Sequence, residues 1–293
     1  MRAMFLTTET TDCGNHVRAW NSLGLRAEHV VFHYKNINND WQLIDKAREY
    51  QPDAMFYIGA HNGSGIPGIK TLCKLYDIAP LIHLCCDAAD APWHSGLTAY
   101  HNKGCFDLQV AIDGAMNVPV DLSVLTPIDP KPFMVTPQRD IRCGFSGGAQ
   151  TGCRRGDIIQ SLEWFSKLTV RKRTAKGDYN GHARFMRRCR IVLNDSQTGT
   201  GTSNHIKGRV VEAGFANCAL LESEGSPIGK WFPEDCYILW RDAQDAARLI
   251  EGLDDKTINH AAKRLAEEVR KRYTARHIYS TILGKIGLHV GST

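Results

Sequence analysis

The stretch Thr198–Glu224, TGTGTSNHIKGRVVEAGFANCALLESE, decides the fold. A loop rich in Gly, Thr and Ser leads into a helical pattern expected over His205–Ala216, and the apolar run Cys218–Glu222 then reads as a buried strand. Another apolar run, Ile191–Asn194, precedes the loop. A strand, a helix and a second strand in succession form a β-α-β unit, which implies a parallel sheet.

The same alternation continues in both directions along the chain. Before residue 134 the expected strands are Ala3–Thr7, Ala27–His33, Ala54–Ile58, Pro80–Cys86 and Leu108–Ile112, and the expected helices are Gly14–Leu23, Trp41–Tyr50 and Ile66–Tyr76. After it the further strands are Arg142–Phe145, Thr169–Arg173 and Cys236–Leu239, and the further helices are Arg155–Phe165, Tyr179–Arg188 and Ala243–Leu253. Two amphipathic helices, Lys256–Arg272 and Ala275–Ile286, end the chain.

A proline-rich segment separates the two halves, with Pro119, Pro127, Pro130, Pro132 and Pro137 in a stretch that has few helix signals. We therefore expect an α/β protein of two Rossmann-like parallel-sheet domains, residues 1–134 and 135–293, with a C-terminal helical tail. The two domains should face one another across a cleft, because ligands of open α/β sheets bind at the carboxyl ends of the strands.

The composition narrows the class of protein. Apolar residues make up 43% and charged residues 23% of the 293, which is typical of a globular chain and excludes collagen-like and disordered classes. We find no run of about 20 apolar residues and no signal-peptide pattern at the start, so a cytoplasmic protein is expected. The ten cysteines form no C-x-x-C pair, which favours reduced core thiols and no metal site.

The charge is divided unevenly between the halves. Residues 1–134 carry a net charge of −4 and residues 135–293 a net charge of +9, so the second half is expected to contact an anion. Its densest basic run, Lys167–Arg190, has nine basic residues and the single acid Asp178. Such a run is either a solvated surface or the contact site of a polyanionic acceptor such as DNA or an anionic membrane.

The helix expected over His205–Ala216 carries the first set of candidate site residues. Lys207 and Arg209, near its positive end, could bind phosphate, and Glu212, one turn later, could accept hydrogen bonds from ribose hydroxyls. The alternative is a solvated helix face on which Arg209 and Glu212 form an ordinary i,i+3 ion pair.

Three segments resemble the C-terminal half of GT-B glycosyltransferases, closest to the spore-maturation (CgeB-like) and glycosyltransferase group 1 families. They are KGRVVEAGFANCALLE from residue 207, WFPEDCYILWRDAQDAARLIEGL from residue 231 and RKRYTARHIYSTIL from residue 270. The resemblance implies a nucleotide-diphosphate sugar donor, expected to be a UDP-sugar, held by the second domain without a tightly bound cofactor or a metal. The first domain would hold the hydroxyl acceptor.

The resemblance also assigns residues. The family's ribose-binding glutamate falls on Glu212, and an acidic donor-sugar contact of related retaining enzymes, eight positions earlier, falls on Asn204. The glycine-rich turn GFSGGAQTGCRR, residues 144–155, lies where the diphosphate loop belongs, with Ser146, Gly147 and Gly148 as the turn. Arg154 or Arg155 would be its cationic partner. By itself this turn is a weak signal, since it lacks the P-loop lysine and the G-x-G-x-x-G pattern.

The first half offers two candidates for a general base, His16 after the first strand and Asp87 after the fourth, the latter in a D-x-x-D pair with Asp90. We thus expect a glycosyltransferase that moves a sugar to a hydroxyl group. Three alternatives stay open: a phage-type glycosyltransferase of modified DNA bases, a nucleotide-sugar epimerase, and a sugar-nucleotide or nucleic-acid binding protein without catalysis.

Overall fold

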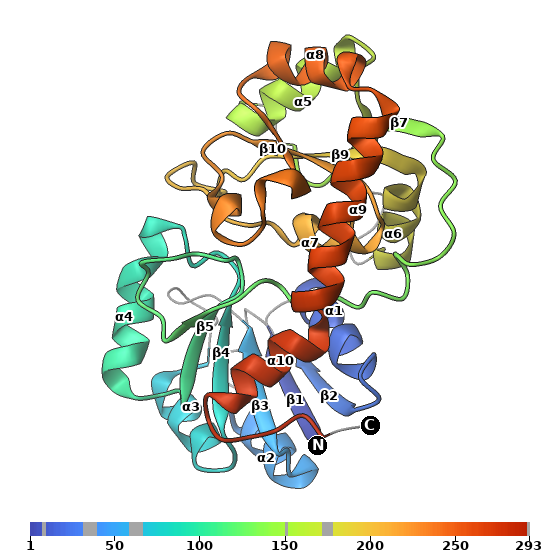
Figure 1. Cartoon of the computed structure of the whole chain (residues 1–293). Coiled ribbons are helices and arrows are strands. Elements are labelled where there is room, and N and C mark those ends of the chain that lie inside the picture. Colours follow the sequence, from blue (N-terminus) through green and yellow to red (C-terminus); the bar gives the residue numbers. More distant parts are fainter. Residues whose placement is uncertain (8–9, 32–39, 59–66, 150–151, 172–177, 292–293) are drawn as a thin grey trace. The chain divides into compact units, whose positions relative to one another are not determined.

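The structure is a computed structural model that describes residues 1–7, 10–31, 40–58, 67–149, 152–171 and 178–291. The chain divides into two compact α/β units (Figure 1). Unit 1 comprises Met1–Asp129 together with Ala275–Thr293, and unit 2 comprises Pro130–Thr274. Each unit contains one parallel sheet, which confirms the expected fold class.

Unit 1 has six strands in the order β2-β1-β3-β4-β5-β6, all paired in parallel. They are β1 (Arg2–Thr7), β2 (Arg26–Val31), β3 (Ala54–Ile58), β4 (Leu81–Cys85), β5 (Leu108–Ala111) and β6 (Leu122–Ser123). The helices are α1 (Thr10–Asn21), α2 (Asp40–Tyr50), α3 (Ile69–Tyr76), α4 (His94–Lys103) and α10 (Ala275–Gly284), with the short 3₁₀ turn η2 (Ala91–Trp93) before α4.

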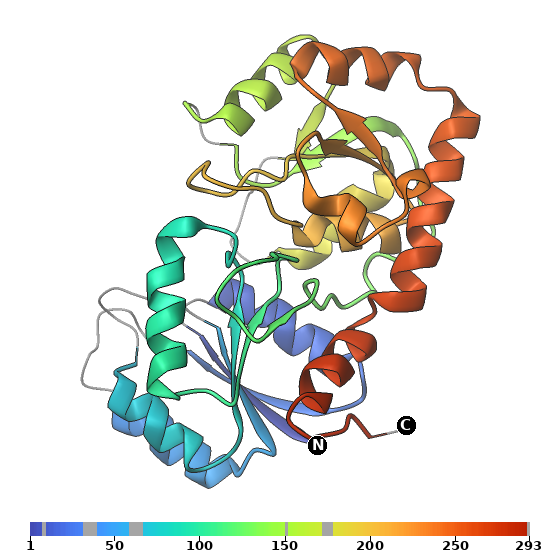
Figure 2. The same ribbon diagram turned by 60° about the vertical axis from the view of Figure 1, so that its left-hand side comes forward.

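Helices cover both faces of this sheet (Figures 1 and 2). Because side chains alternate along a strand, Met4 and Leu6 of β1 pack with the apolar residues of α2 and α3, and Phe5 points to the opposite face. There Phe5 stacks on Phe56 at 4.8 Å between ring centroids. A strand that is buried on both faces has apolar residues at consecutive positions, so it appears in the sequence as a continuous apolar run.

The C-terminal helix α10 belongs to unit 1. Its Tyr279 is fully buried, with ring centroids 5.0 Å from Trp20 of α1 and 5.6 Å from Phe56 of β3. Edge-to-face contacts between aromatic rings stabilise the packing of α10 by more than the burial of their apolar surface alone would. Residues 275–293 were expected in the second domain, whereas this aromatic cluster packs α10 in unit 1.

Unit 2 has five parallel strands in the order β11-β10-β9-β7-β8. They are β7 (Ile141–Ser146), β8 (Thr169–Arg171), β9 (Cys189–Asn194), β10 (Ala219–Ser223) and β11 (Ile238–Trp240). The helices are α5 (Arg154–Trp164), α6 (Tyr179–Arg188), α7 (Gly208–Phe215), α8 (Ala243–Gly252) and α9 (Asp255–Arg272), with 3₁₀ turns η3 (Pro227–Lys230) and η4 (Glu234–Cys236).

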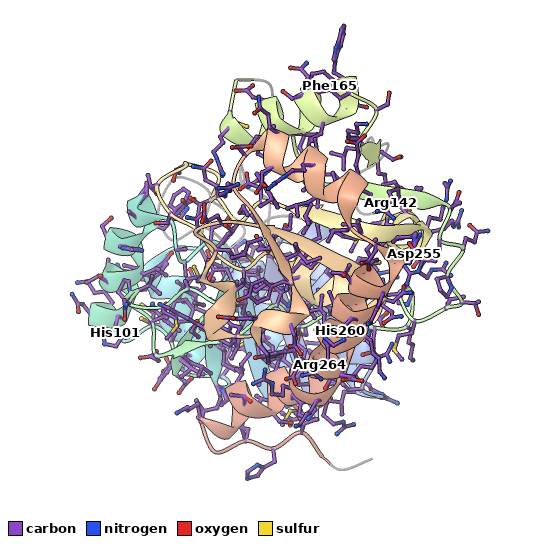
Figure 3. All side chains as sticks on the ribbon, turned by 45° about the horizontal axis from the view of Figure 1, so that its top comes forward. His101, Arg142, Phe165, Asp255, His260 and Arg264 are labelled. Atoms are coloured by element: carbon purple, nitrogen blue, oxygen red, sulfur yellow. The ribbon has the colours of Figure 1, made fainter. Side chains whose placement is uncertain are left out.

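The long helix α9 is attached to the rest of unit 2 by charge and by close packing. Asp255 in its first turn pairs with Arg142 of β7 at 3.7 Å (Figure 3). It also pairs with Arg190 of β9 at 2.7 Å. Further along, Val269 lies against Gly214 of α7, so closely that a Cβ on the glycine would stand 2.9 Å from the Cβ of Val269. Glycine lets the two helices approach at this point.

Two other observations concern the described residues alone. None of their helices combines the length and the apolar character needed to cross a membrane. Nine of the ten cysteines are described, all as free thiols, and six of them are buried. This is the environment expected of cysteines that act as small apolar core residues.

We expect Gly214→Ala to destabilise unit 2 by roughly 1–3 kcal/mol, because the added methyl group overlaps Val269 and the helices must move apart. Gly252→Ala is the matched control, since nothing lies within 4 Å of a Cβ built there, and it should leave stability unchanged or raise it slightly. Denaturant unfolding monitored by circular dichroism measures both. Equal stabilities of the two variants would contradict the close packing of α7 on α9.

Candidate functional site

Polar side chains gather where the three central strands of unit 2 end. Ser146 ends β7, Asn194 ends β9, and Glu222 with Ser223 ends β10. Because these strands are neighbours and run in parallel, their carboxyl ends meet at one edge of the sheet. All four residues are buried. Ligands of open α/β sheets bind at such an edge, so this edge is the candidate site.

Arg209 of α7 is the centre of this group. Its Nε and Nη2 donate to the Ser146 carbonyl oxygen at 3.0 and 2.7 Å, its Nη1 donates to Asn194 Oδ1, and its guanidinium lies 4.6 Å from the centroid of the Phe145 ring. Burial lowers the pKa of Arg209 to about 10. Gly147 permits this arrangement, because a Cβ there would overlap the Arg209 guanidinium.

A second chain of hydrogen bonds joins Ser146, His182 and Glu212. Ser146 Oγ lies 2.9 Å from His182 Nδ1, and His182 Nε2 lies 2.8 Å from Glu212 Oε2. Burial raises the pKa of Glu212, but the neighbouring His182 and Arg209 outweigh it and leave that pKa below its ordinary value. Glu212 is therefore an ionised carboxylate, 9% exposed, held in one direction by the imidazole.

A second buried carboxyl group behaves in the opposite way. Glu222 accepts a hydrogen bond from Asn194 Nδ2 at 2.7 Å and another from the Ser223 amide at 3.1 Å. Burial nevertheless raises the pKa of Glu222 to about 7, because no cation contacts it directly among the residues that the structure describes. Asn194 thus joins Arg209 on one side to Glu222 on the other.

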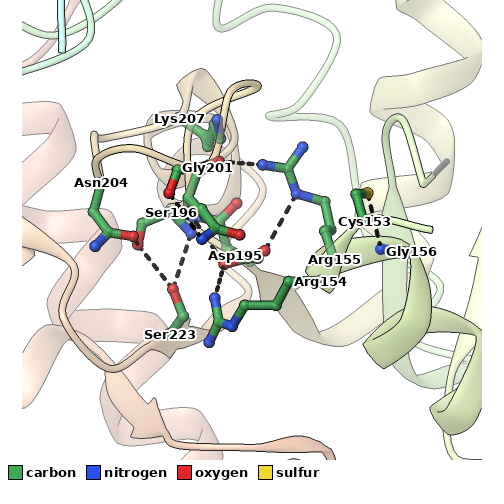
Figure 4. Close-up of polar contacts among 12 residues, drawn as sticks. Cys153, Arg154, Arg155, Gly156, Asp195, Ser196, Gly201, Asn204, Lys207 and Ser223 are labelled. Atoms are coloured by element: carbon green, nitrogen blue, oxygen red, sulfur yellow. Dashed lines mark hydrogen bonds and ion pairs between the residues drawn. The ribbon is translucent and has the colours of Figure 1, made fainter. Parts of the chain in front are cut away.

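Arg154 and Arg155, at the start of α5, both face the buried Asp195 (Figure 4). Arg154 Nη1 donates to Asp195 Oδ1 at 3.0 Å, and Arg155 Nε lies 3.4 Å from Oδ2, near enough for an ion pair although not aligned as a hydrogen bond. One carboxylate thus faces two guanidinium groups. The pair retains a net positive charge beside the glycine-rich turn, where Gly148 has open space around it.

The start of α7 differs from the prediction. The helix begins at Gly208 rather than at His205, and Lys207 is its N-cap without a side-chain capping bond. The reason is local pairing: the His205 amide donates to the Ser196 carbonyl at 3.0 Å, and Gln197 forms a bridge with Asn204. The half-buried Lys207 contacts His205 through its ammonium group.

Asn204 lies in this loop, exposed, and its Oδ1 accepts a hydrogen bond from Ser196 Oγ at 3.0 Å. Ser196 in turn contacts Ser223 Oγ at 2.8 Å. Asn204 is thereby tied to the carboxyl end of β10, at the same edge as Glu222. All nine residues predicted for donor binding lie in unit 2, in β7, α5, α7 and the loops beside these elements.

The two predicted bases lie in different surroundings in unit 1. His16 of α1 is 3% exposed, its ring stacks on Phe5, and its Nδ1 is 3.4 Å from the hydroxyl oxygen of Tyr279. Burial lowers the pKa of His16 to about 4, so its imidazole is neutral near pH 7. Asp87 is exposed and lies two residues after the end of β4.

Several residues of this edge were not among the predicted site residues, namely His182, Asn194, Asp195, Glu222 and Ser223. Asn194 and Asp195 carry a usable signal, since polar residues at the end of a buried strand of a parallel sheet, or directly after it, lie at its binding edge. His182 has no such signal. It reaches Glu212 only because α6 and α7 pack together, and no spacing in the sequence records that contact.

The basic run Lys167–Arg190 is less unpaired than its sequence indicates. Lys167 contacts Glu251, Arg188 contacts Asp140 and Arg190 contacts Asp255, all carboxylates outside the run. Arg171 pairs with Asp178 at 2.7 Å, and Lys172, Arg173 and Lys176 lie outside the described residues. Within the described ranges no three His, Cys, Asp or Glu side chains are grouped so as to hold a metal ion.

A family model described as glycosyl transferase-like matches residues 137–284, slightly more than half of the chain. Among curated protein sequences none matches this one.

Solved structures share the fold over nearly the whole chain. The Anabaena protein HepE in complex with UDP-glucose is 11% identical, with 98% of this chain and 99% of that chain covered and a TM-score of 0.67. A glycosyltransferase from Rickettsia africae is 8% identical over 98% and 99% of the two chains, with a TM-score of 0.62. An alpha-glucosyltransferase in complex with UDP-glucose and DNA is 11% identical over 98% and 99%, with a TM-score of 0.64. These likenesses identify the fold as GT-B.

The burial of His16 makes the stability of the chain depend on pH. Its pKa falls from an ordinary 6.5 to about 4 in the folded state, so between these values the unfolded chain binds more protons. The free energy of unfolding should therefore decrease as the pH falls from 6.5 towards 4, by roughly 3 kcal/mol in total, and should be unaffected by His16 above pH 6.5.

His16→Leu should remove this part of the pH dependence, whereas His289→Leu, at an exposed position of the same unit, should keep it. Thermal or urea unfolding at pH 5 and pH 7 measures the difference. The same slope in wild type and His16→Leu would contradict the burial of His16.

Proposed function

This chain belongs to the glycosyl transferase-like family and is a GT-B glycosyltransferase, and we propose that its donor is a UDP-sugar bound at the carboxyl edge of the unit 2 sheet. HepE and the alpha-glucosyltransferase share this fold and were solved with UDP-glucose, which supports uridine as the nucleoside of the donor. The acceptor is a hydroxyl group bound by unit 1.

One observation carries the donor site, namely the ionised Glu212 carboxylate that His182 holds at 2.8 Å. A carboxylate kept charged in a largely buried place accepts hydrogen bonds strongly, and the two hydroxyls of a ribose are suitable donors. The glutamate that binds ribose in the resembling family falls on Glu212. His182 orients this carboxylate, because it occupies one oxygen and leaves the rest of the acceptor capacity to the nucleotide.

The diphosphate belongs beside the turn Ser146–Gly148. Gly148 lets a ligand approach the backbone closely, and the net positive charge of Arg154 and Arg155 lies next to the turn. Lys207 stands at the start of α7, where the helix dipole adds to its charge. Arg209 holds the turn in place by donating to the Ser146 carbonyl oxygen. Its positive charge attracts the diphosphate from the opposite side of the turn.

In the reaction the bond between the sugar's anomeric carbon and the diphosphate oxygen breaks, and a bond from that carbon to the acceptor oxygen forms. The cationic groups of unit 2 stabilise the charge that develops on the departing UDP. A base takes the acceptor's proton. We propose Asp87 for this role, because it is exposed at the carboxyl edge of the unit 1 sheet, whereas His16 is enclosed by aromatic side chains.

We expect Glu212→Ala to weaken UDP binding about 10- to 150-fold, the loss of a charged hydrogen bond worth ~1.5–3 kcal/mol. Wild type should prefer UDP over 2′,3′-dideoxy-UDP, and Glu212→Ala should lose that preference. His182→Ala should reduce the preference as well, and His182→Gln should restore part of it, because an amide can still donate to the carboxylate. Titration calorimetry with the two nucleotides measures these ratios.

The control is Glu251→Ala, which removes an exposed carboxylate elsewhere in unit 2. It should bind both nucleotides as wild type does. An undiminished preference for UDP in Glu212→Ala would remove this residue from the ribose site, whereas an effect on both nucleotides alike would indicate a structural role.

For the base, Asp87→Asn should lower kcat about 10²- to 10⁴-fold with little effect on the affinity for the donor. Asp107→Asn, at another carboxylate of unit 1, serves as the control. UDP release and sugar isomerisation are followed together, because transfer produces free UDP whereas an epimerase returns an isomeric UDP-sugar. Turnover of Asp87→Asn within a few fold of wild type would exclude Asp87 as the base.

A further inference from the structure

A hollow lined by three arginines lies on unit 2, between the last turns of α6 and the segment that leads into β7. Its volume is about 200 Å³, several times the ~30 Å³ that a water molecule occupies in the liquid. We call it the arginine hollow, and its lining residues are Thr136, Gln138, Arg184, Arg187 and Arg188. All five belong to unit 2, so the hollow is complete within that unit.

The charges of the hollow are only partly balanced. Arg188 is bound to the Asp140 carboxylate through Nε and Nη2. Arg187 makes one long contact, from Nη1 to the Thr136 carbonyl oxygen at 3.5 Å. Its Nε is buried and has no hydrogen-bond partner among the residues that the structure describes. A buried N–H donor without a partner is costly, so an acceptor is expected to reach it.

Arg184 adds a second charge at the rim. It is exposed and contributes to lowering the pKa of Asp178, after the Gly181 amide and Arg171, the residue that pairs with that carboxylate. The helix dipole accounts for cations in the last turn of α6, where Arg187 and Arg188 lie. It does not account for Arg184, which lies almost a turn earlier and faces the same hollow.

We propose that the arginine hollow binds a phosphate group. Two guanidinium groups, Arg184 and Arg187, would donate to its oxygens, because planar forks of N–H donors match phosphate well. The amide of Gln138 and the hydroxyl of Thr136 supply further donors at the rim. About two negative charges on a phosphate then balance the two arginines that Asp140 leaves unpaired.

The phosphate can come from two sources. One is the backbone of a nucleic acid, and the other is a small phosphorylated molecule or free phosphate. The hollow is built from residues that the donor site does not use, so this inference stands whether or not the donor is a UDP-sugar.

The experiment compares wild type with Arg184→Gln/Arg187→Gln and with a control that also loses two exposed positive charges from unit 2, Arg248→Gln/Lys263→Gln. Inorganic phosphate is titrated by calorimetry, and a labelled duplex oligonucleotide is titrated by fluorescence anisotropy at several salt concentrations. UDP is titrated in parallel. Because Arg187 is half-buried, the exposed single variant Arg184→Glu is included in case the double variant unfolds.

We expect phosphate to bind wild type and the control alike, and to bind the double variant and Arg184→Glu at least about tenfold more weakly, with UDP affinity unchanged throughout. If the source is a nucleic acid, the duplex also binds, and the log–log salt slope becomes shallower by about 0.9 for each phosphate that the variant no longer neutralises. If the source is small, only phosphate responds. No phosphate or duplex binding by wild type, or equally weakened binding in the control, would overturn the proposal.

Discussion

The half-buried cation of Arg209 is the constraint on which the unit 2 site depends. A charge taken out of water is costly unless hydrogen bonds and opposite charges surround it. Here the Ser146 carbonyl, Asn194 and the ring of Phe145 supply those contacts, and each sits at the carboxyl end of β7 or β9. The glycine-rich turn therefore takes its shape from a cation on another helix. Any change in the turn must also leave that cation satisfied.

The same cation separates the behaviour of two carboxyl groups. Glu212 has both Arg209 and the bonded His182 near it, and its pKa lies below the ordinary value in spite of burial. Glu222 reaches Arg209 only through the amide of Asn194, and burial raises its pKa to about 7. Two chemically identical groups at one edge of the sheet thus differ in charge near neutral pH. Only the first is a permanent anion that suits a hydroxyl-rich ligand.

Much of the fold could be predicted from the sequence, because strands buried on two faces are continuous apolar runs and α6 has a regular apolar stripe. Helix α4 was missed: HSGLTAYHNK buries only Gly96, Leu97 and Tyr100, and its N-cap Trp93 makes no side-chain capping bond. The prediction for α7 began three residues too early, because the pairing of Gln197 with Asn204 is a tertiary contact. The ends of the strands and the family motif were enough to predict where the site lies. The partners of Arg209 and Glu212 could not be predicted, because they come from elements distant in the chain.

The return of α10 to unit 1 has a consequence for the order in which the protein folds during synthesis. Unit 2 is inserted between the first 129 residues and the last helix, so the ribosome completes unit 2 before the residues that fill the core of unit 1 emerge. Domains usually fold from the N-terminus onward. In this chain Phe5, Trp20 and Phe56 of the nascent unit 1 stay uncovered by Tyr279 until α10 has left the exit tunnel. A premature stop late in the message would leave one unit complete and the other with an open aromatic face.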